Sequence, residues 1–206
     1  MLWYERGDVS PLWELAPEEM LCLDVETTGL KAGFDEVLQL ALVRGDDLML
    51  MNGLFGTERR KCWPNAQHVH GIAPVDVDGL PSLRMRSSEV SSILSGAKLL
   101  IGYNLVFDLA FLKAAGVHIP HIMQFDVMRE VAPVIGRRKR HGAGFDWVRL
   151  EQCVRHYGVQ LHPHDALEDA QATLLCFWRM LEDDDSDIGN AGPISYLDIA
   201  RRRGRL

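Results

Sequence analysis

Hydrophobic residues recur along the chain at two spacings, and the spacing predicts where strands and helices lie. Short, nearly continuous apolar runs bounded by turn residues predict strands at 20–25, 36–43, 47–54, 98–103 and 121–125. Apolar residues at helical spacing predict helices at 65–71, 87–95, 105–115, 126–132, 146–157 and 165–181. An early strand meander followed by alternating strands and helices predicts an α/β fold, with a mixed sheet and helices on both faces.

Turn and capping residues predict where several of these elements end. Gly45-Asp46-Asp47 is expected to form the turn between the second and third strands. Asn104 can cap the helix at 105–115, and Gly116 can end it. Pro133 is expected to end the preceding helical pattern at 132.

The length of 206 residues fits one domain with a sizeable core. We expect that domain at 20–181, after an irregular lead-in at 1–19 and before an acidic and then basic tail at 182–206. Three tryptophans are expected in the core, namely Trp63, Trp147 and Trp178.

Composition is that of a globular protein, with 47% hydrophobic and 25% charged residues. No apolar run reaches the length of a membrane span, and the first residues lack the pattern of a signal peptide. Four scattered cysteines without a C-x-x-C pair indicate reduced thiols, so a cytoplasmic protein is expected. A net charge of −7 argues against nonspecific coating of nucleic acid, but it allows a local basic patch. The Gly-flanked run at 137–140 is either such a phosphate contact or a solvated loop.

Two carboxylates lie two residues apart on the first expected strand. Side chains alternate faces along a strand, so Asp24 and Glu26 point one way while Leu23 and Val25 point the other. Like charges side by side on a buried strand are costly unless a cation lies between them. The pair therefore predicts a hard-cation site, although a solvent-exposed strand face gives the same pattern. Residues 27–29, Thr-Thr-Gly, come directly after this pair and favour a cation site. This small turn leaves backbone N–H groups near the two carboxylates.

Asn104 and Asp108 form a second group. They are four residues apart and share a helical face that points back toward a strand end. Phe107 and Phe111 lie on another stripe, which is mostly core. Asp108 alone is also explained as a first-turn acid, which the helix dipole favours.

His164 and Asp169 form a third group, at the start of the last helix. Asp165 and Glu168 resemble a capping box, so this helix is expected to begin at Asp165. An offset of five residues turns side chains roughly 140° apart at about 100° per residue, so His164 and Asp169 need not touch. They can flank a common site, one as a ligand and the other as a base. A loop histidine beside ordinary first-turn acids is the alternative.

Together these segments resemble the DEDDh family of 3′–5′ exonucleases, which includes the proofreading subunit of bacterial replicative polymerases. The matching motifs are D-x-E-T-T-G-L at 24–30, N-x-x-F-D at 104–108 and H-x-x-x-x-D at 164–169, with a softer V-H-G-I at 69–72. The resemblance covers about residues 20–181. It implies a ribonuclease H-like α/β fold, with a mixed five-stranded sheet flanked by helices on both faces.

The resemblance also implies chemistry, namely hydrolysis of phosphodiester bonds at a 3′ end with release of nucleoside 5′-monophosphates. Two divalent ions, Mg²⁺ or Mn²⁺, would be held by Asp24, Glu26, Asp108 and Asp169, with Asp24 bridging them. His164 would be the general base that deprotonates the attacking water. The nucleotide-binding positions that it implies are Thr27, Thr28, His70, Asn104 and Phe107; core packing is an equal explanation for Phe107.

The nucleic acid itself stays open at this point. A single-stranded DNA 3′ end is favoured, and trimming of RNA or oligoribonucleotides is the alternative. A non-catalytic nucleic-acid-binding module is less expected, because it would not need all five catalytic groups. A ribonuclease H-type endonuclease would lack His164. A polymerase or repair partner is expected, and a membrane partner is not.

Overall fold

The computed structural model describes residues 10–160 and 164–182, so the expected tail at 183–206 lies outside the described residues. Its centre is a mixed sheet of five strands in the order β3-β2-β1-β4-β5. β1 is antiparallel to β2 and parallel to β4, β2 is antiparallel to β3, and β4 is parallel to β5. The strands are β1 Met20–Thr27, β2 Val37–Arg44, β3 Met49–Leu54, β4 Leu99–Gly102 and β5 Met123–Asp126. The predicted α/β fold and mixed five-stranded sheet are confirmed.

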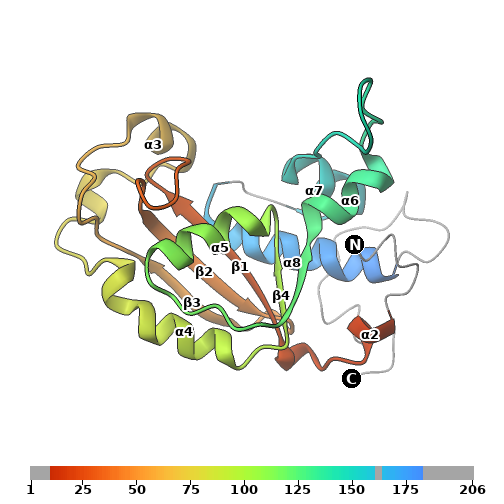
Figure 1. The fold of residues 1–206 in the computed structure, drawn as a ribbon, viewed down its shortest axis with the longest axis horizontal. Helices are drawn as coiled ribbons and strands as arrows, with labels where there is room; N and C mark the ends of the chain where they lie inside the picture. The colour runs from red at the N-terminus through yellow and green to blue at the C-terminus, as the bar shows by residue number, and fades with distance from the viewer. Residues whose placement is uncertain (1–9, 161–163, 183–206) are drawn as a thin grey trace.

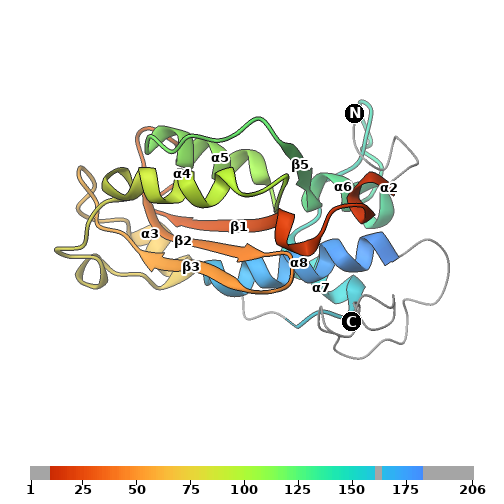
Figure 2. The ribbon, with the colours of Figure 1, turned by 90° about the horizontal axis from the view of Figure 1, so that it is seen from below.

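Helices cover both faces of the sheet, which gives three layers (Figures 1 and 2). One face carries α4 Ser87–Ser95 and α5 Leu105–Ala114, and the other carries α8 Ala166–Glu182. Between β5 and α8 the chain forms α6 Val127–Ile135 and α7 Leu150–Tyr157, and both pack on α8. A further helix, α3 Pro64–His70, follows β3. Within the described residues, no helix has the length and apolarity needed to cross a bilayer.

The alternation along β1 divides the core into two clusters. Leu21, Leu23 and Val25 pack in the cluster beneath α4 and α5, whereas Cys22 packs with α8 in the other. This pattern puts Asp24 and Glu26 on the α8 face, as the sequence predicts. β4 pairs with β1 only as far as Cys22, so among the described strands the last part of β1 has no neighbour on that side.

Several predicted element ends hold, and others do not. The turn at 45–47 and the helix stop at Gly116 are confirmed, since Gly116 has φ 86° and its N–H donates to Lys113 O at 2.9 Å. The predicted stop before Pro133 is wrong, because α6 continues to Ile135. Proline has a helix-compatible φ and costs one backbone hydrogen bond, a loss that burial of Val131 and Ala132 offsets.

The helix predicted from 146 begins only at Leu150. Arg149, which precedes it, has extended backbone at ψ 152°, and its N–H donates to Gln152 Oε1 at 3.2 Å. Trp63 and Trp178 are buried as predicted, but the core assignment of Trp147 is wrong, because its side chain is 57% exposed. The extended segment before α7 turns this ring outward.

The lead-in is not irregular throughout. A short helix, α2 Ser10–Trp13, is followed by a 3₁₀ turn at Pro17–Glu19 that leads into β1. Leu12 and Leu15 are buried in the cluster beneath α8. Their apolar side chains therefore extend the core to residues that precede the expected domain start.

Candidate active site

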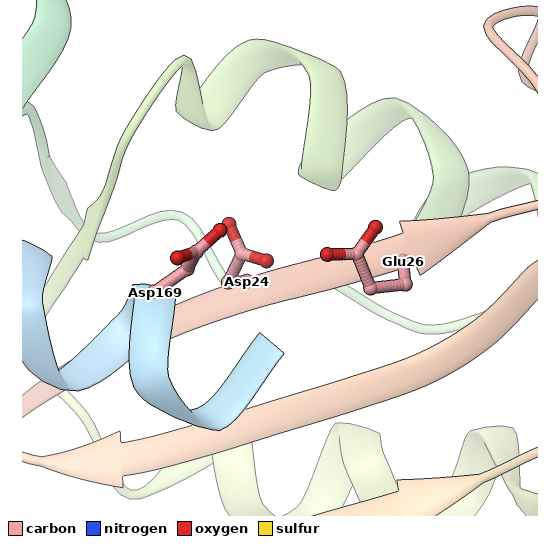
Figure 3. A group of neighbouring side chains, drawn as sticks. All are labelled: Asp24, Glu26 and Asp169. Atoms are coloured by element: carbon pink, nitrogen blue, oxygen red, sulfur yellow. The ribbon is translucent and has the colours of Figure 1, made fainter. Parts of the chain in front are cut away.

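Three carboxylates from β1 and α8 meet at one place. Asp24 and Glu26 come from β1 and Asp169 comes from α8, and one oxygen of each lies within 4.8 Å of the others (Figure 3). All three side chains are partly buried. The structure thus brings together carboxylates from two of the three sequence motifs.

Burial raises the pKa of all three carboxyl groups, and the charges of neighbouring acids raise each pKa further. The pKa of Asp24 lies well above its ordinary value, mainly from burial and then from the charges of Asp108 and Asp169. Burial, followed by the charge of Asp169, raises the pKa of Glu26 to about 8. Burial raises the pKa of Asp169 to about 6, against a lowering contact from the backbone N–H of His164. A bound cation would reverse this repulsion.

Asp108 adds a fourth carboxylate from α5. Its side chain is 2% exposed, and burial raises its pKa well above the ordinary value, although the backbone N–H of Val25 opposes the rise. Asp108 Oδ2 and Asp169 Oδ1 are buried and have no hydrogen-bond partner among the described residues. Buried carboxylate oxygens without partners fit a hard divalent ion, because Mg²⁺ and Mn²⁺ prefer oxygen ligands.

The turn before α5 positions Asp108. Asn104 has a left-handed backbone, φ 62° and ψ 43°, and its side chain makes no capping hydrogen bond. The predicted side-chain cap is therefore wrong. Instead, the backbone N–H of Asn104 donates to Asp126 Oδ1 at 3.0 Å, at the end of β5. The carboxyl end of a parallel strand is where α/β sheets place functional groups, so Asp126 could have been found from the sequence.

The start of α8 is held against the sheet by Gln39 of β2, which lies opposite Glu26 in the strand register. Gln39 Nε2 donates to Asp165 Oδ2 at 3.0 Å, and Gln39 Oε1 accepts from the Ala166 N–H at 3.3 Å. Asp165 Oδ1 in turn accepts from the N–H groups of Leu167 and Glu168 at 3.0 and 3.2 Å. Asp165 therefore caps α8, and the helix begins at Ala166, one position after the predicted start. Gln39 escaped the sequence prediction, because an isolated strand glutamine carries no signal.

His164 lies just outside α8 with φ 74°, a left-handed conformation that is uncommon for residues other than glycine. Its backbone N–H donates to Asp169 Oδ2 at 3.4 Å, and its side chain is exposed. The two residues are thus neighbours through the backbone. Strained backbone of this kind gathers at functional sites.

The two threonines after Glu26 are buried and shape the loop that follows β1. Thr27 Oγ1 donates to Gly29 O at 2.6 Å, and Thr28 Oγ1 accepts from the Glu36 N–H at 3.0 Å. A Cβ on Gly29 would lie 2.6 Å from Asp35 Oδ2, so any other residue there would displace the buried Asp35 carboxylate. Both hydroxyl groups therefore have roles inside the loop.

The ring of His70 is held at both nitrogens. Nδ1 lies 3.0 Å from the Ile72 N and must accept from it, so Nε2 carries the proton and donates to Thr27 O at 3.2 Å. Burial lowers the pKa of His70, and the charge of His164 lowers it further. His70 is thus a neutral group that fixes the backbone at Thr27.

The remaining predicted nucleotide-binding residues lie at the start of α5. The side chain of Asn104 is exposed. Phe107 is partly buried, with its ring centroid 4.8 Å from that of Phe111 at 46°. Phe107 packs at the margin of the core with one part accessible.

Comparisons with known proteins assign the family. A model of the RNase_T family, described as exonuclease, matches residues 21–177. The chain therefore belongs to this exonuclease family. The resemblance to DEDDh exonucleases of the ribonuclease H-like superfamily is thereby confirmed for family and fold.

Individual relatives show how far the similarity extends along the chain. The chain is 25% identical over 183 residues to a PolC-type DNA polymerase III of Oceanobacillus iheyensis, covering 82% of this chain but 12% of that polymerase. It thus spans about an eighth of this relative's length. Exonuclease X in complex with 5′-overhanging duplex DNA has a TM-score of 0.59 at 18% identity, over 81% of this chain and 94% of that one. The zinc-bound E. coli exonuclease I complex with single-stranded DNA has a TM-score of 0.62 at 18% identity. This match covers 81% of this chain and 41% of that one. These structural likenesses establish the fold.

Proposed function

We propose that the chain is a DEDDh 3′–5′ exonuclease that hydrolyses phosphodiester bonds at nucleic-acid 3′ ends and releases nucleoside 5′-monophosphates. The observation that carries the proposal is the meeting of Asp24, Glu26 and Asp169 beside the buried Asp108, in a chain of the exonuclease family. The catalytic unit occupies 20–181, with the residues around Leu12 and Leu15 completing its core.

Asp24, Glu26, Asp108 and Asp169 would hold two divalent ions, Mg²⁺ or Mn²⁺. When bound, such ions lower the pKa of a water and neutralise charge that develops on the phosphate. The raised pKa of Glu26, about 8, and of Asp169, about 6, supports cation binding here. Near neutral pH the Glu26 carboxyl needs a cation to be ionised, and a cation would also favour the ionised form of Asp169.

His164 would act as the general base that takes the proton of the attacking water. Its exposed ring leaves room for that water, and the contact between its N–H and Asp169 keeps it beside the carboxylates. Proton transfer to a positioned side chain contributes about 10²–10⁴-fold to such reactions. The backbone at Thr27, fixed by His70, would receive the terminal 3′ hydroxyl. Asn104 and Phe107 would contact the last nucleotides, and Thr28 would act only through its backbone.

A single-stranded DNA 3′ end is the favoured substrate. The exonuclease I and exonuclease X complexes contain single-stranded DNA and overhanging duplex DNA, which supports DNA over RNA. The likeness to PolC-type polymerases supports a polymerase or repair partner. A cytoplasmic location stays a prediction from the cysteine pattern.

The test is degradation of 5′-labelled and 3′-labelled oligonucleotides with Mg²⁺, using single-stranded DNA, duplex DNA and RNA in parallel. We expect a 3′ label to be released at once as a mononucleotide and a 5′ label to give a shrinking ladder. Asp24→Asn should abolish both products, while Asp78→Asn, which removes an exposed acid, should not. Internal cuts, or full activity of Asp24→Asn, would contradict the proposal. Faster loss of RNA than of DNA would assign the alternative substrate.

A further inference from the structure

A basic hairpin projects from the body of the protein between α6 and α7 (Figure 1). It comprises residues 137–147, and its two sides pair through an antiparallel bridge between Arg138 and Phe145. The Lys139 N–H donates to Gly144 O at 3.1 Å, and the Asp146 N–H donates to Arg137 O at 2.8 Å. For the basic run at 137–140, the sequence allowed either a phosphate contact or a solvated loop. In the structure this run belongs to an ordered, hydrogen-bonded element.

The base of the hairpin is packed tightly. A Cβ on Gly136 would lie 2.3 Å from Ala132 O and 2.7 Å from Asp146 O, so glycine allows both backbones to approach. Gly142 and Gly144, with φ values of 87° and 95°, form the turn at the tip. This construction presents a defined surface away from the core.

The hairpin concentrates positive charge and exposed aromatic surface. Five basic residues and one acid lie between 137 and 149, in a chain whose net charge is −7. The side chains at 137–140 are exposed, and among the described residues none of them pairs with a carboxylate. Arg138 lies over the Phe145 ring at 5.7 Å, and Lys139 lies over the Trp147 ring at 5.6 Å. Trp147 is 57% exposed, which is unusual for a residue with so much apolar surface.

Two hydrogen bonds and one charge interaction connect the elements beside the hairpin to the carboxylate site. Tyr103, next to Asn104, donates its hydroxyl to Val148 O at 2.7 Å, directly after Trp147. α6, which leads into the hairpin, starts after Asp126, and Asp126 accepts the Asn104 N–H. At the start of α7, the charge of Glu151 contributes to the raised pKa of Asp169. The hairpin thus rises from the same edge of the sheet as the site.

We propose that the basic hairpin binds the single-stranded nucleic acid upstream of the 3′ end, with its cations on backbone phosphates and Trp147 stacked on an unpaired base. Alternating cations and aromatic rings are the combination that binds single strands without reading sequence. The proposal rests on the proposed exonuclease function, because it places this strand relative to the carboxylates. The ligand class is single-stranded nucleic acid rather than duplex, since a stacking ring needs an unpaired base.

The test compares two variants with wild type. One replaces Arg138, Lys139 and Arg140 with glutamine, and the other is Trp147→Ala. Their kcat/KM values are measured on an oligothymidylate of about 20 nucleotides, longer than one strand-binding site, and on a thymidine dinucleotide. We expect the ratio of the two values to fall at least about ten-fold in each variant. A control that replaces Arg84, Arg86 and Lys113 with glutamine removes equal charge elsewhere and should keep the ratio.

Binding is measured separately in an Asp24→Asn background, with melting curves to check that each variant folds. Each lost phosphate contact should reduce the slope of log affinity against log salt by about 0.7, so the triple variant should lose about 2. An unchanged slope with an unchanged substrate ratio would overturn the proposal. Equal losses for blunt duplex and single strand in Trp147→Ala would overturn the single-strand assignment.

The experiments distinguish failure of the proposed exonuclease function from failure of the hairpin proposal. Wild-type protein that degrades no oligonucleotide with Mg²⁺ or Mn²⁺ contradicts the exonuclease, whereas the binding measurement still decides the role of the hairpin. Active wild type with unaffected variants contradicts the hairpin alone.

Discussion

Gln39 Nε2 donates to Asp165 Oδ2 at 3.0 Å, and this contact joins β2 to the cap of α8. Because Gln39 lies opposite Glu26, the same residue aligns the strand that carries two carboxylates with the helix that carries the third. The distance between Glu26 and Asp169 therefore depends on an amide that needs no contact with substrate.

Replacing Gln39 with alanine should reduce kcat by at least about ten-fold, since small displacements of catalytic groups are costly. It should also lower the free energy of unfolding by about 1–3 kcal/mol, because buried partners lose hydrogen bonds. Steady-state kinetics and urea unfolding measure both. Asn52→Ala is the matched control, because it removes the other acceptor of Gln39 Nε2 and leaves the contact with Asp165. Equal effects of the two substitutions would show that Gln39 does not act through α8.

Removing the charge of Glu26 should stabilise the metal-free protein while abolishing activity. A carboxyl whose pKa is higher in the folded state binds its proton more tightly there, so stability falls as pH rises from 4.5 toward about 8. Glu26→Gln removes this loss, and at pH 8 its free energy of unfolding should exceed that of wild type by at least about 1 kcal/mol. Urea unfolding with EDTA at pH 5 and 8 measures the difference. A variant less stable than wild type at pH 8 would disprove the repulsion.

Metal binding should strengthen with pH. The ion must displace protons from Glu26, whose pKa is about 8, and from Asp169, whose pKa is about 6. Each displaced proton makes affinity rise with pH below the pKa of its group, so Mn²⁺ should bind at least about ten-fold more tightly at pH 8 than at pH 6. Calorimetry in two buffers of different ionisation enthalpy measures the protons released. Binding without proton release would contradict the raised pKa values. EDTA should remove all nuclease activity, and Mg²⁺ should restore it.

His164→Ala should lower kcat by about 10²–10⁴-fold, as loss of a general base does. Its exposed side chain makes a change in folding stability small. Mn²⁺ affinity should be retained, which separates a base from a ligand. His68→Ala, another exposed histidine, is the control and should keep wild-type kcat. Wild-type turnover by His164→Ala would exclude this residue as the base.

Replacement of His70 should act differently from replacement of His164. His70 Nε2 donates to Thr27 O, so His70→Ala should loosen the loop after β1 and raise KM more than it lowers kcat. Steady-state kinetics on a short oligonucleotide give the two constants. An effect on kcat alone would instead assign His70 to the chemical step.

Local patterns in the sequence were sufficient for the sheet, for most helices and for the acidic motifs. Alternation along β1 determines that Asp24 and Glu26 share a face, because strand geometry leaves no other choice. Pro133 and Trp147 show the limit of such reasoning. A proline can remain in a helix whose neighbours are buried, and an aromatic side chain turns outward when its backbone is extended beside a hairpin.

The tertiary structure decided which distant residues meet. Gln39 is a single strand glutamine with no local signature, yet it holds the start of α8. Asp126 lies at a strand end that the sequence predicts, but only the fold shows that it holds the start of α5. Contacts between residues more than 20 positions apart depend on the packing of whole elements, which no local spacing encodes. The sequence by itself therefore determined the chemistry available to this protein. The fold determined the distances, the burial and the raised pKa values that turn Asp24, Glu26, Asp108 and Asp169 into one site.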